Sequence, residues 1–114
     1  MTSPHDRPTA SELVESVREW IERDVMPAVE GRLQFHARVA MNSLDVVLRE
    51  LDLGPGQAER HADRLARLGY PDDAALAAAI REGRHDDNLA ALVAELRGAV
   101  EDKVRVANPR HLLD

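Results

Sequence analysis

Apolar residues recur at helical spacing along most of this chain, and the other segments are organised around residues 31–52. When the residues of this stretch are placed about 100° apart around a helix, the polar ones fall into one lane. That lane consists of Gln34, Arg38, Asn42, Asp45 and Arg49. The remaining arc is apolar and about twice as wide as the ~100° stripe of a surface helix. We therefore expect a central helix over residues 31–52 that is contacted on more than one side.

Shorter apolar patterns on either side predict further helices. The first should begin at a cap on Thr9 or Ser11 and should end or bend at Pro27, which has no N–H to donate. The sequence Gly54-Pro55-Gly56 should end the central helix, because both residue types interrupt helices. Three more helices should follow: one from about residue 55 or 57 to Leu68, a short one from Asp72 or Asp73 to Glu82, and a long one from Asp86 or Asp87 to residue 107.

No segment alternates apolar and polar residues with the period of two that a strand shows. We expect an all-α, single-domain bundle of about five helices, three long and two shorter, around the central helix 31–52. Residues 1–8 should be a disordered lead and residues 9–114 the helical domain. The tail, residues 108–113, carries two leucines after a helix-breaking Asn-Pro. It should dock either on its own domain or on a neighbouring molecule.

Length and charge narrow the classes of function. A chain of 114 residues suits one domain with one core. Its net charge of −6 argues against binding to nucleic acid or to an anionic membrane surface, because both require a basic face. No apolar run approaches the ~20 residues of a transmembrane helix, and the first residues lack the apolar segment of a signal peptide. A cytoplasmic location is therefore expected, and the absence of cysteine fits a reducing compartment.

Two polar residues interrupt the apolar arc of the central helix. His36 and Ser43 lie on one line along it, with Arg32 and Glu50 at the ends of that line. Burying an unpaired imidazole or hydroxyl group costs on the order of a kcal/mol or more, so both side chains should find a partner. Two interpretations stay open: a hydrogen-bonded histidine of the core, or a polar spot in a pocket or at a subunit contact.

The sequence offers no set of residues for catalysis or metal binding. The local clusters are His61 with Asp63, and His85 with Asp86 and Asp87. Neither has the pair of histidines four residues apart or the Glu-x-x-His repeat of metal sites in helical bundles. Ser43 lies ~10 Å from His36 along the helix axis, too far for a nucleophile and its base. We expect no metal, no cofactor and no catalytic residue, which favours a non-catalytic protein over an enzyme.

Several short blocks of sequence are distinctive, above all Phe-His-Ala-Arg-Val-Ala-x-Asn at residues 35–42. The others are residues 19–20, 25–27, 30–33, 49–51, 102–104 and 108–110. Together they resemble a small bacterial family of domains of unknown function, over nearly the whole chain from about Pro8 to His111. Genes of that family are often found beside those for acyl-CoA dehydrogenases and aminoglycoside-phosphotransferase-like kinases. The resemblance therefore implies an accessory role near acyl-CoA metabolism or a small-molecule kinase.

Six polar residues within these blocks are candidate contacts with a ligand or a partner. They are Arg32, His36, Arg38, Asn42, Asn108 and Arg110. The leading hypothesis is a non-catalytic interaction protein that forms a homodimer and partners an acyl-CoA dehydrogenase or a phosphotransferase-like kinase, because the apolar arc is wider than one bundle needs. The alternative is a protein or enzyme that binds an anionic or acyl-CoA-type molecule through Arg32, His36 and Arg38, since guanidinium groups suit anions.

Overall fold

A computed structural model describes residues 6–113 of the chain. Within that range the chain forms four α-helices and no strand. These are α1 (Ala10–Trp20), α2 (Arg32–Leu68), α3 (Asp73–Arg81) and α4 (Leu89–Ala107), with the short helices η1 (Ile21–Val25), η2 (Met26–Ala28) and η3 (Pro109–Leu113). The all-α prediction is confirmed, whereas the prediction of about five helices is wrong. The disordered lead predicted over residues 1–8 falls mainly on residues 1–5, which lie outside the described residues.

The helix count differs because α2 continues through Gly54-Pro55-Gly56 and is one helix of 37 residues. Pro55 lacks an N–H and therefore removes one hydrogen bond, the one to the carbonyl of Leu51. Neither neighbouring glycine has a positive φ, so both adopt a helical backbone. The three residues thus cost helix stability without ending the helix.

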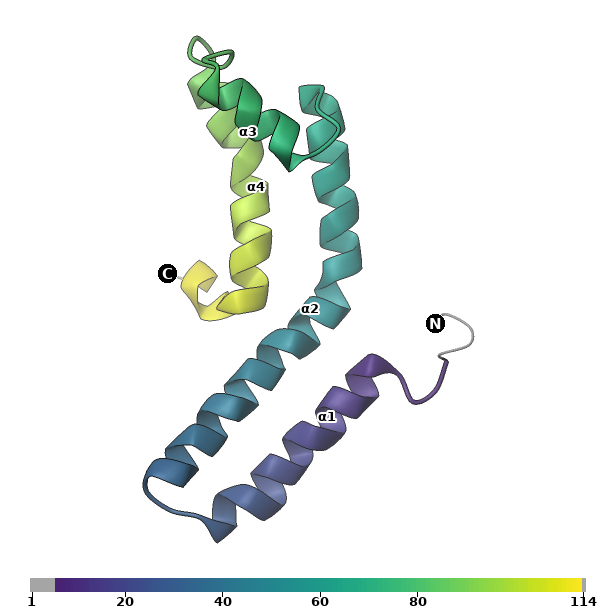
Figure 1. Cartoon of the computed structure of the whole chain (residues 1–114), viewed down its shortest axis with the longest axis vertical. Coiled ribbons are helices and arrows are strands. Elements are labelled where there is room, and N and C mark those ends of the chain that lie inside the picture. Colours follow the sequence, from purple (N-terminus) through teal and green to yellow (C-terminus); the bar gives the residue numbers. More distant parts are fainter. Residues whose placement is uncertain (1–5, 114) are drawn as a thin grey trace. The chain divides into compact units, whose positions relative to one another are not determined.

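The chain divides into two compact units, residues 1–53 and 54–114, and α2 contributes to both. The first unit is a helical hairpin in which α1 lies beside the N-terminal half of α2 (Figure 1). At the start of α1, Thr9 Oγ1 accepts a hydrogen bond from the Glu12 N–H, and the Glu12 carboxylate accepts one from the Thr9 N–H, both at 3.0 Å. This capping box confirms Thr9 as the cap and satisfies two donors that the first turn leaves free.

The corner between the two helices of the hairpin is built in steps. After α1 the backbone widens into the π-helix η1, and Pro27 then lies in the single turn of η2, where its missing N–H leaves no helical bond unmade. Gly31, with a φ of +62°, turns the chain into α2. The Gln34 side chain donates to the carbonyls of Met26 and Val29 at 3.3 and 3.2 Å, which holds the corner against the start of α2.

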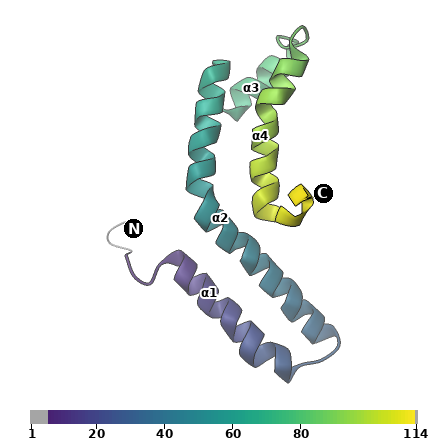
Figure 2. The ribbon, with the colours of Figure 1, turned by 180° about the vertical axis from the view of Figure 1, so that it is seen from behind.

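In the second unit, the C-terminal part of α2 and α4 lie side by side, and α3 packs against both (Figures 1 and 2). Each of the three helices supplies one leucine to the buried cluster: Leu65, Leu76 and Leu92. Leu68, Tyr70 and Leu96 pack against that cluster. α2 ends at Leu68, where the third predicted helix was expected to end, and Gly69 follows with a φ of +88°. Asp72 caps α3 by accepting from the Ala75 N–H at 2.8 Å.

The last helix begins later than predicted. Its N-cap is Asn88, so the prediction of Asp86 or Asp87 as the cap is wrong. The residues before it form consecutive turns, in which the N–H groups of Asp86 and Asn88 donate to the carbonyls of Gly83 and His85. These turns delay the start of the helix. α4 ends before Asn108-Pro109 as predicted, and the tail forms η3, which contacts α4.

Candidate interaction surface

The hairpin of the first unit leaves many large apolar side chains exposed. We call the following set the hairpin face: Leu13, Val17 and Trp20 of α1, and Leu33, Phe35, Val39, Val47 and Leu51 of α2. Leu33 is 63% exposed, and both Trp20 and Phe35 are 58% exposed. By contrast, among residues 6–53 the buried hydrophobic side chains are only those of Ala37 and Met41. The hairpin therefore has more exposed large hydrophobic side chains than buried ones.

The geometry of α2 explains this exposure. Ala37, Met41 and the half-buried Leu44 and Leu48 share the side of α2 that packs in the hairpin. The rest of the apolar arc forms two exposed stripes, one with Leu33, Val47 and Leu51 and the other with Phe35 and Val39. Between these stripes runs a polar line formed by Arg32, His36, Ser43 and Glu50. The prediction that α2 is contacted on more than one side is therefore not fulfilled within the hairpin.

A shallow apolar cup opens beside the first stripe at the closed end of the hairpin. Its volume is about 300 Å³. It is lined by Trp20, Ile21, Val25, Val29, Leu33, His36, Ala37 and Ala40. Two residues of the lining, Ile21 and Val25, belong to η1. His36 is the only polar residue of the lining, so the cup suits an apolar group.

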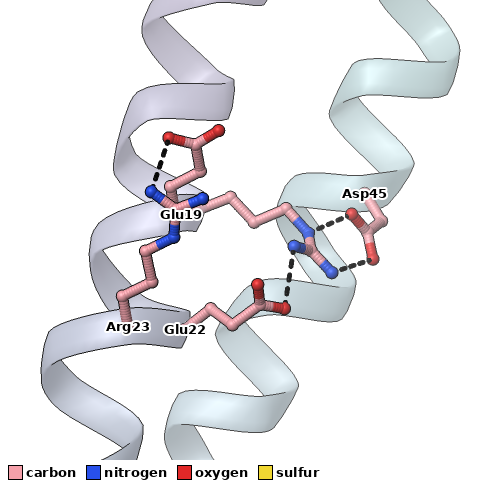
Figure 3. Close-up of polar contacts among 5 residues, drawn as sticks. Glu19, Glu22, Arg23 and Asp45 are labelled. Atoms are coloured by element: carbon pink, nitrogen blue, oxygen red, sulfur yellow. Dashed lines mark hydrogen bonds and ion pairs between the residues drawn. The ribbon is translucent and has the colours of Figure 1, made fainter.

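One ion pair fixes the two helices of the hairpin against each other. The Arg18 guanidinium donates to both carboxylate oxygens of Asp45, with Nε–Oδ1 at 2.5 Å and Nη2–Oδ2 at 3.5 Å. It also donates to Glu22 at 3.3 Å; Asp45 and Glu22 are labelled in Figure 3. The hydrogen bond to Asp45 raises the pKa of Arg18 above its ordinary value. This bidentate contact fixes the rotation of α1 relative to α2, and so determines which side chains remain on the hairpin face.

The structure places Arg32 and His36 together and at the surface. They lie one turn apart on the polar line, and both are exposed. The interpretation of His36 as a core histidine is therefore wrong; its ring borders the cup and meets the Phe35 ring edge to face, with centroids 5.6 Å apart. Ser43 donates to the backbone carbonyl of Val39 at 3.1 Å, so its hydroxyl is satisfied within the helix.

The other four candidate residues lie elsewhere. Arg38 and Asn42 are exposed on another side of α2. Arg38 lies about 120° or more around the helix from Arg32 and His36, so these three residues do not converge. Among the described residues, neither the Arg38 nor the Asn42 side chain makes a hydrogen bond or ion pair. Asn108 and Arg110 belong to the second unit, where Asn108 follows the end of α4 and Arg110 is exposed in η3.

The second unit contains a polar contact that the sequence patterns did not predict. Three arginines of α2 face α4 in an antiparallel register: Arg60 pairs with Asp102 at 3.3 Å, Arg67 pairs with Glu95 at 2.6 Å, and Arg64 lies between them against Gly98. Arg64 is only 7% exposed, and no carboxylate among the described residues pairs with it. The signal that could have located it is Gly98, since a glycine inside a helix often marks a close approach of a neighbouring group.

A histidine supports the buried Arg64 in place of a carboxylate. Arg64 donates to Nδ1 of His61 at 3.0 Å, which leaves Nε2 of His61 to donate to Asp73 at 2.6 Å. A similar contact joins the segment after α2 to the turns before α4, where Tyr70 donates to Nε2 of His85 at 2.6 Å. Both histidines thus act as structural hydrogen-bonding groups. Within residues 6–113 no three His, Cys, Asp or Glu side chains come together as a metal-binding group.

Residues 27–111 match the family described as a domain of unknown function (DUF6285), a match that includes all of α2, α3 and α4. This confirms the resemblance to a family of unknown function. No curated protein and no solved structure matches the chain. Among the described residues, no helix has the length and apolar character needed to cross a membrane.

Proposed function

The chain belongs to the DUF6285 family of domains of unknown function, and we propose that it is a non-catalytic interaction protein that docks another protein chain on its hairpin face. The observation that supports this proposal is the contrast between two buried hydrophobic residues and eight exposed ones in the hairpin. Monomeric proteins rarely expose large contiguous apolar patches unless these patches are interaction sites.

The physical gain from covering the hairpin face is large. Full burial of a leucine, valine or phenylalanine side chain contributes roughly 1.5–3 kcal/mol. Docking must offset the loss of translational and rotational freedom, estimated at about 4–15 kcal/mol. Several of the eight side chains must therefore be covered together, which requires a partner surface as broad as a helix or a helical hairpin.

The partners we propose are a second copy of the chain and, as in an accessory complex, an acyl-CoA dehydrogenase or a phosphotransferase-like kinase of the cytoplasm. The family resemblance motivates the latter two partners. An accessory role also fits the candidate residues, because Arg32, His36 and Glu50 run through the apolar surface as a polar line that can select a partner by charge.

The test is a comparison of three baits in a pull-down from the native lysate, to which a differently tagged second copy has been added. The baits are the natural chain, Val47→Asp on the hairpin face and Asn42→Asp on the opposite, polar side of α2. We expect the natural chain and Asn42→Asp to recover the same partners, and Val47→Asp to lose them. Asn42→Asp is the control, because it adds the same negative charge to α2 as Val47→Asp does. Equal recovery of partners by all three baits would overturn the proposal.

A second candidate function is binding of a small molecule with an apolar tail and an anionic head. The observation that favours it is the apolar cup, which opens beside His36 and one turn from Arg32. Thermal-shift measurements with acyl-CoA esters and fatty acids test this function. A rise in the melting temperature that Arg32→Ala removes and Arg38→Ala preserves is expected, because Arg38 lies on another side of the helix. No rise with any of these ligands would refute it.

A further inference from the structure

The polar line on α2 carries opposite charges at its two ends. Arg32 and Glu50 are 18 residues apart, which is about five turns of an α-helix, so their side chains leave the helix in the same direction. Both are exposed, and neither forms a hydrogen bond or ion pair with any of residues 6–113. Leu33 and Leu51 of the neighbouring stripe have the same spacing, and they too are exposed. The outer surface of α2 therefore carries a positive charge with a leucine at one end, Arg32 and Leu33, and a negative charge with a leucine at the other, Glu50 and Leu51.

This arrangement is complementary to itself in only one orientation. If a second copy of α2 lies antiparallel to the first, with the centre of contact near Met41 and Asn42 along the axis, Arg32 of each copy lies opposite Glu50 of the other. The same register brings Leu33 of each copy to Leu51 of the other. In a parallel pair, two arginines would meet at one end and two glutamates at the other. Like charges that face each other oppose association.

The centre of this contact is largely apolar. Between the two charged ends, the outer surface of α2 carries Val39, Ala40 and Val47 together with His36 and Ser43. The Ser43 hydroxyl already donates to the Val39 carbonyl, so covering it leaves no donor without a partner. Small and β-branched side chains at the centre also allow two helices to approach closely, at the 8–10 Å separation typical of packed helices.

We infer that two copies of the chain associate through α2 in an antiparallel, two-fold symmetric contact, with Arg32–Glu50 ion pairs between the copies at both ends. This inference rests on the proposed function and specifies its partner and register. Each ion pair is formed twice because the contact is isologous. The pairs lie at the rim of the contact, where charges contribute chiefly to specificity.

The test uses charge reversal at the two ends. Arg32→Glu alone places two glutamates opposite each other at both ends, and Glu50→Arg alone places two arginines there. We expect each single variant to self-associate about tenfold more weakly than the natural chain in sedimentation equilibrium. An equimolar mixture of the two variants should associate as strongly as the natural chain, because the heterodimer restores both ion pairs. The double variant Arg32→Glu/Glu50→Arg should also recover self-association, and Arg38→Glu, on another side of α2, should leave it unchanged.

The outcomes separate this inference from the proposed function. If Val47→Asp abolishes self-association while neither charge reversal weakens it, the hairpin face docks a second copy in another register and the antiparallel contact is wrong. If both single variants weaken self-association and their mixture does not restore it, the ends do not face each other, and the inference is likewise wrong. If the natural chain is a monomer at all concentrations, the second copy is excluded as the occupant, and the pull-down decides whether the proposed function survives.

Discussion

Gly98 lies where the Arg64 guanidinium passes against α4, and this position tests the buried contact of the second unit. A Cβ atom at Gly98 would lie 2.7 Å from Nη2 of Arg64. Replacing a glycine inside a helix with alanine normally stabilises a protein by about 0.5–1 kcal/mol. Here we expect Gly98→Ala to lower the free energy of unfolding by about 1 kcal/mol or more, because the buried guanidinium must move. Urea denaturation measures this change.

The chain offers a matched control for that substitution. At Gly56, the nearest atom to an added Cβ is Nη1 of Arg60 at 3.4 Å, the far end of an exposed and flexible side chain. Gly56→Ala should therefore stabilise the protein by about 0.5–1 kcal/mol, as in an ordinary helix. Equal stabilisation by Gly98→Ala would mean that Arg64 does not occupy the space over Gly98.

The capping box of α1 predicts a pH dependence. Hydrogen bonds from the backbone N–H and then the side chain of Thr9 lower the pKa of Glu12 below its ordinary value of 4.5. Because the pKa of Glu12 is lower in the folded chain than in the unfolded chain, its ionised carboxylate stabilises the folded state. This stabilisation is complete when the pH lies above the unfolded pKa, and it is lost as the pH falls through the folded pKa. We expect the melting temperature of the natural chain to exceed that of Glu12→Gln near neutral pH, and the difference to disappear well below pH 4.5. A difference that does not change with pH would contradict the capping contact.

At the scale of elements, α2 is the helix that contributes to both compact units, and its continuity through residues 54–56 can be tested. If residues 54–56 are helical, Pro55→Ala restores one backbone hydrogen bond and removes the helix-breaking ring. Proline inside a helix costs about 3 kcal/mol relative to alanine, so we expect a clear rise in melting temperature and in helical circular dichroism. If these residues formed a loop instead, the same substitution would lower stability, because proline rigidifies the unfolded chain.

The local ends of the elements could be predicted from the sequence, whereas the continuity of α2 could not. Helix ends depend on the capping residue itself and on the adjacent turn, so local sequence patterns reveal them. Examples are the N-caps Thr9 and Asp72 and the glycine after α2, Gly69. Gly54-Pro55-Gly56 carries the local signal of a break, yet α2 continues through it. Asn88 was missed for a similar reason, since two aspartates before it are equally good caps by residue type.

The candidate surface was predictable in part. The wide apolar arc of residues 31–52 and its polar line were visible in the sequence, because helical periodicity alone defines them. The cup was not visible, because its lining comes from α1, η1, the corner and α2, which only the folded hairpin brings together. Arg64 was also missed, since its burial depends on a glycine 34 residues further along the chain.

At the scale of the whole molecule, the two units differ in how they bury apolar residues. The second unit has a core to which three helices contribute, Leu65, Leu76 and Leu92. The first unit has a bidentate ion pair, a capping box and two small-to-medium buried residues, but an apolar face that remains open. Surface ion pairs contribute about 0–1 kcal/mol, and a single half-buried pair such as Arg18–Asp45 does not replace a core. Under the proposed function, a partner that covers the hairpin face would add to the stability of the hairpin.

Trp20 reports directly on whether a second copy covers that face. It is the only tryptophan of the chain, it is 58% exposed in the single copy, and it borders the cup beside Leu33. Acrylamide quenching and the emission maximum of Trp20 should be measured from nanomolar to high micromolar concentration. We expect Trp20 to become shielded and its emission to shift to the blue as concentration rises, and to remain exposed throughout in Val47→Asp. Equal quenching at every concentration in the natural chain would contradict self-docking through the hairpin face.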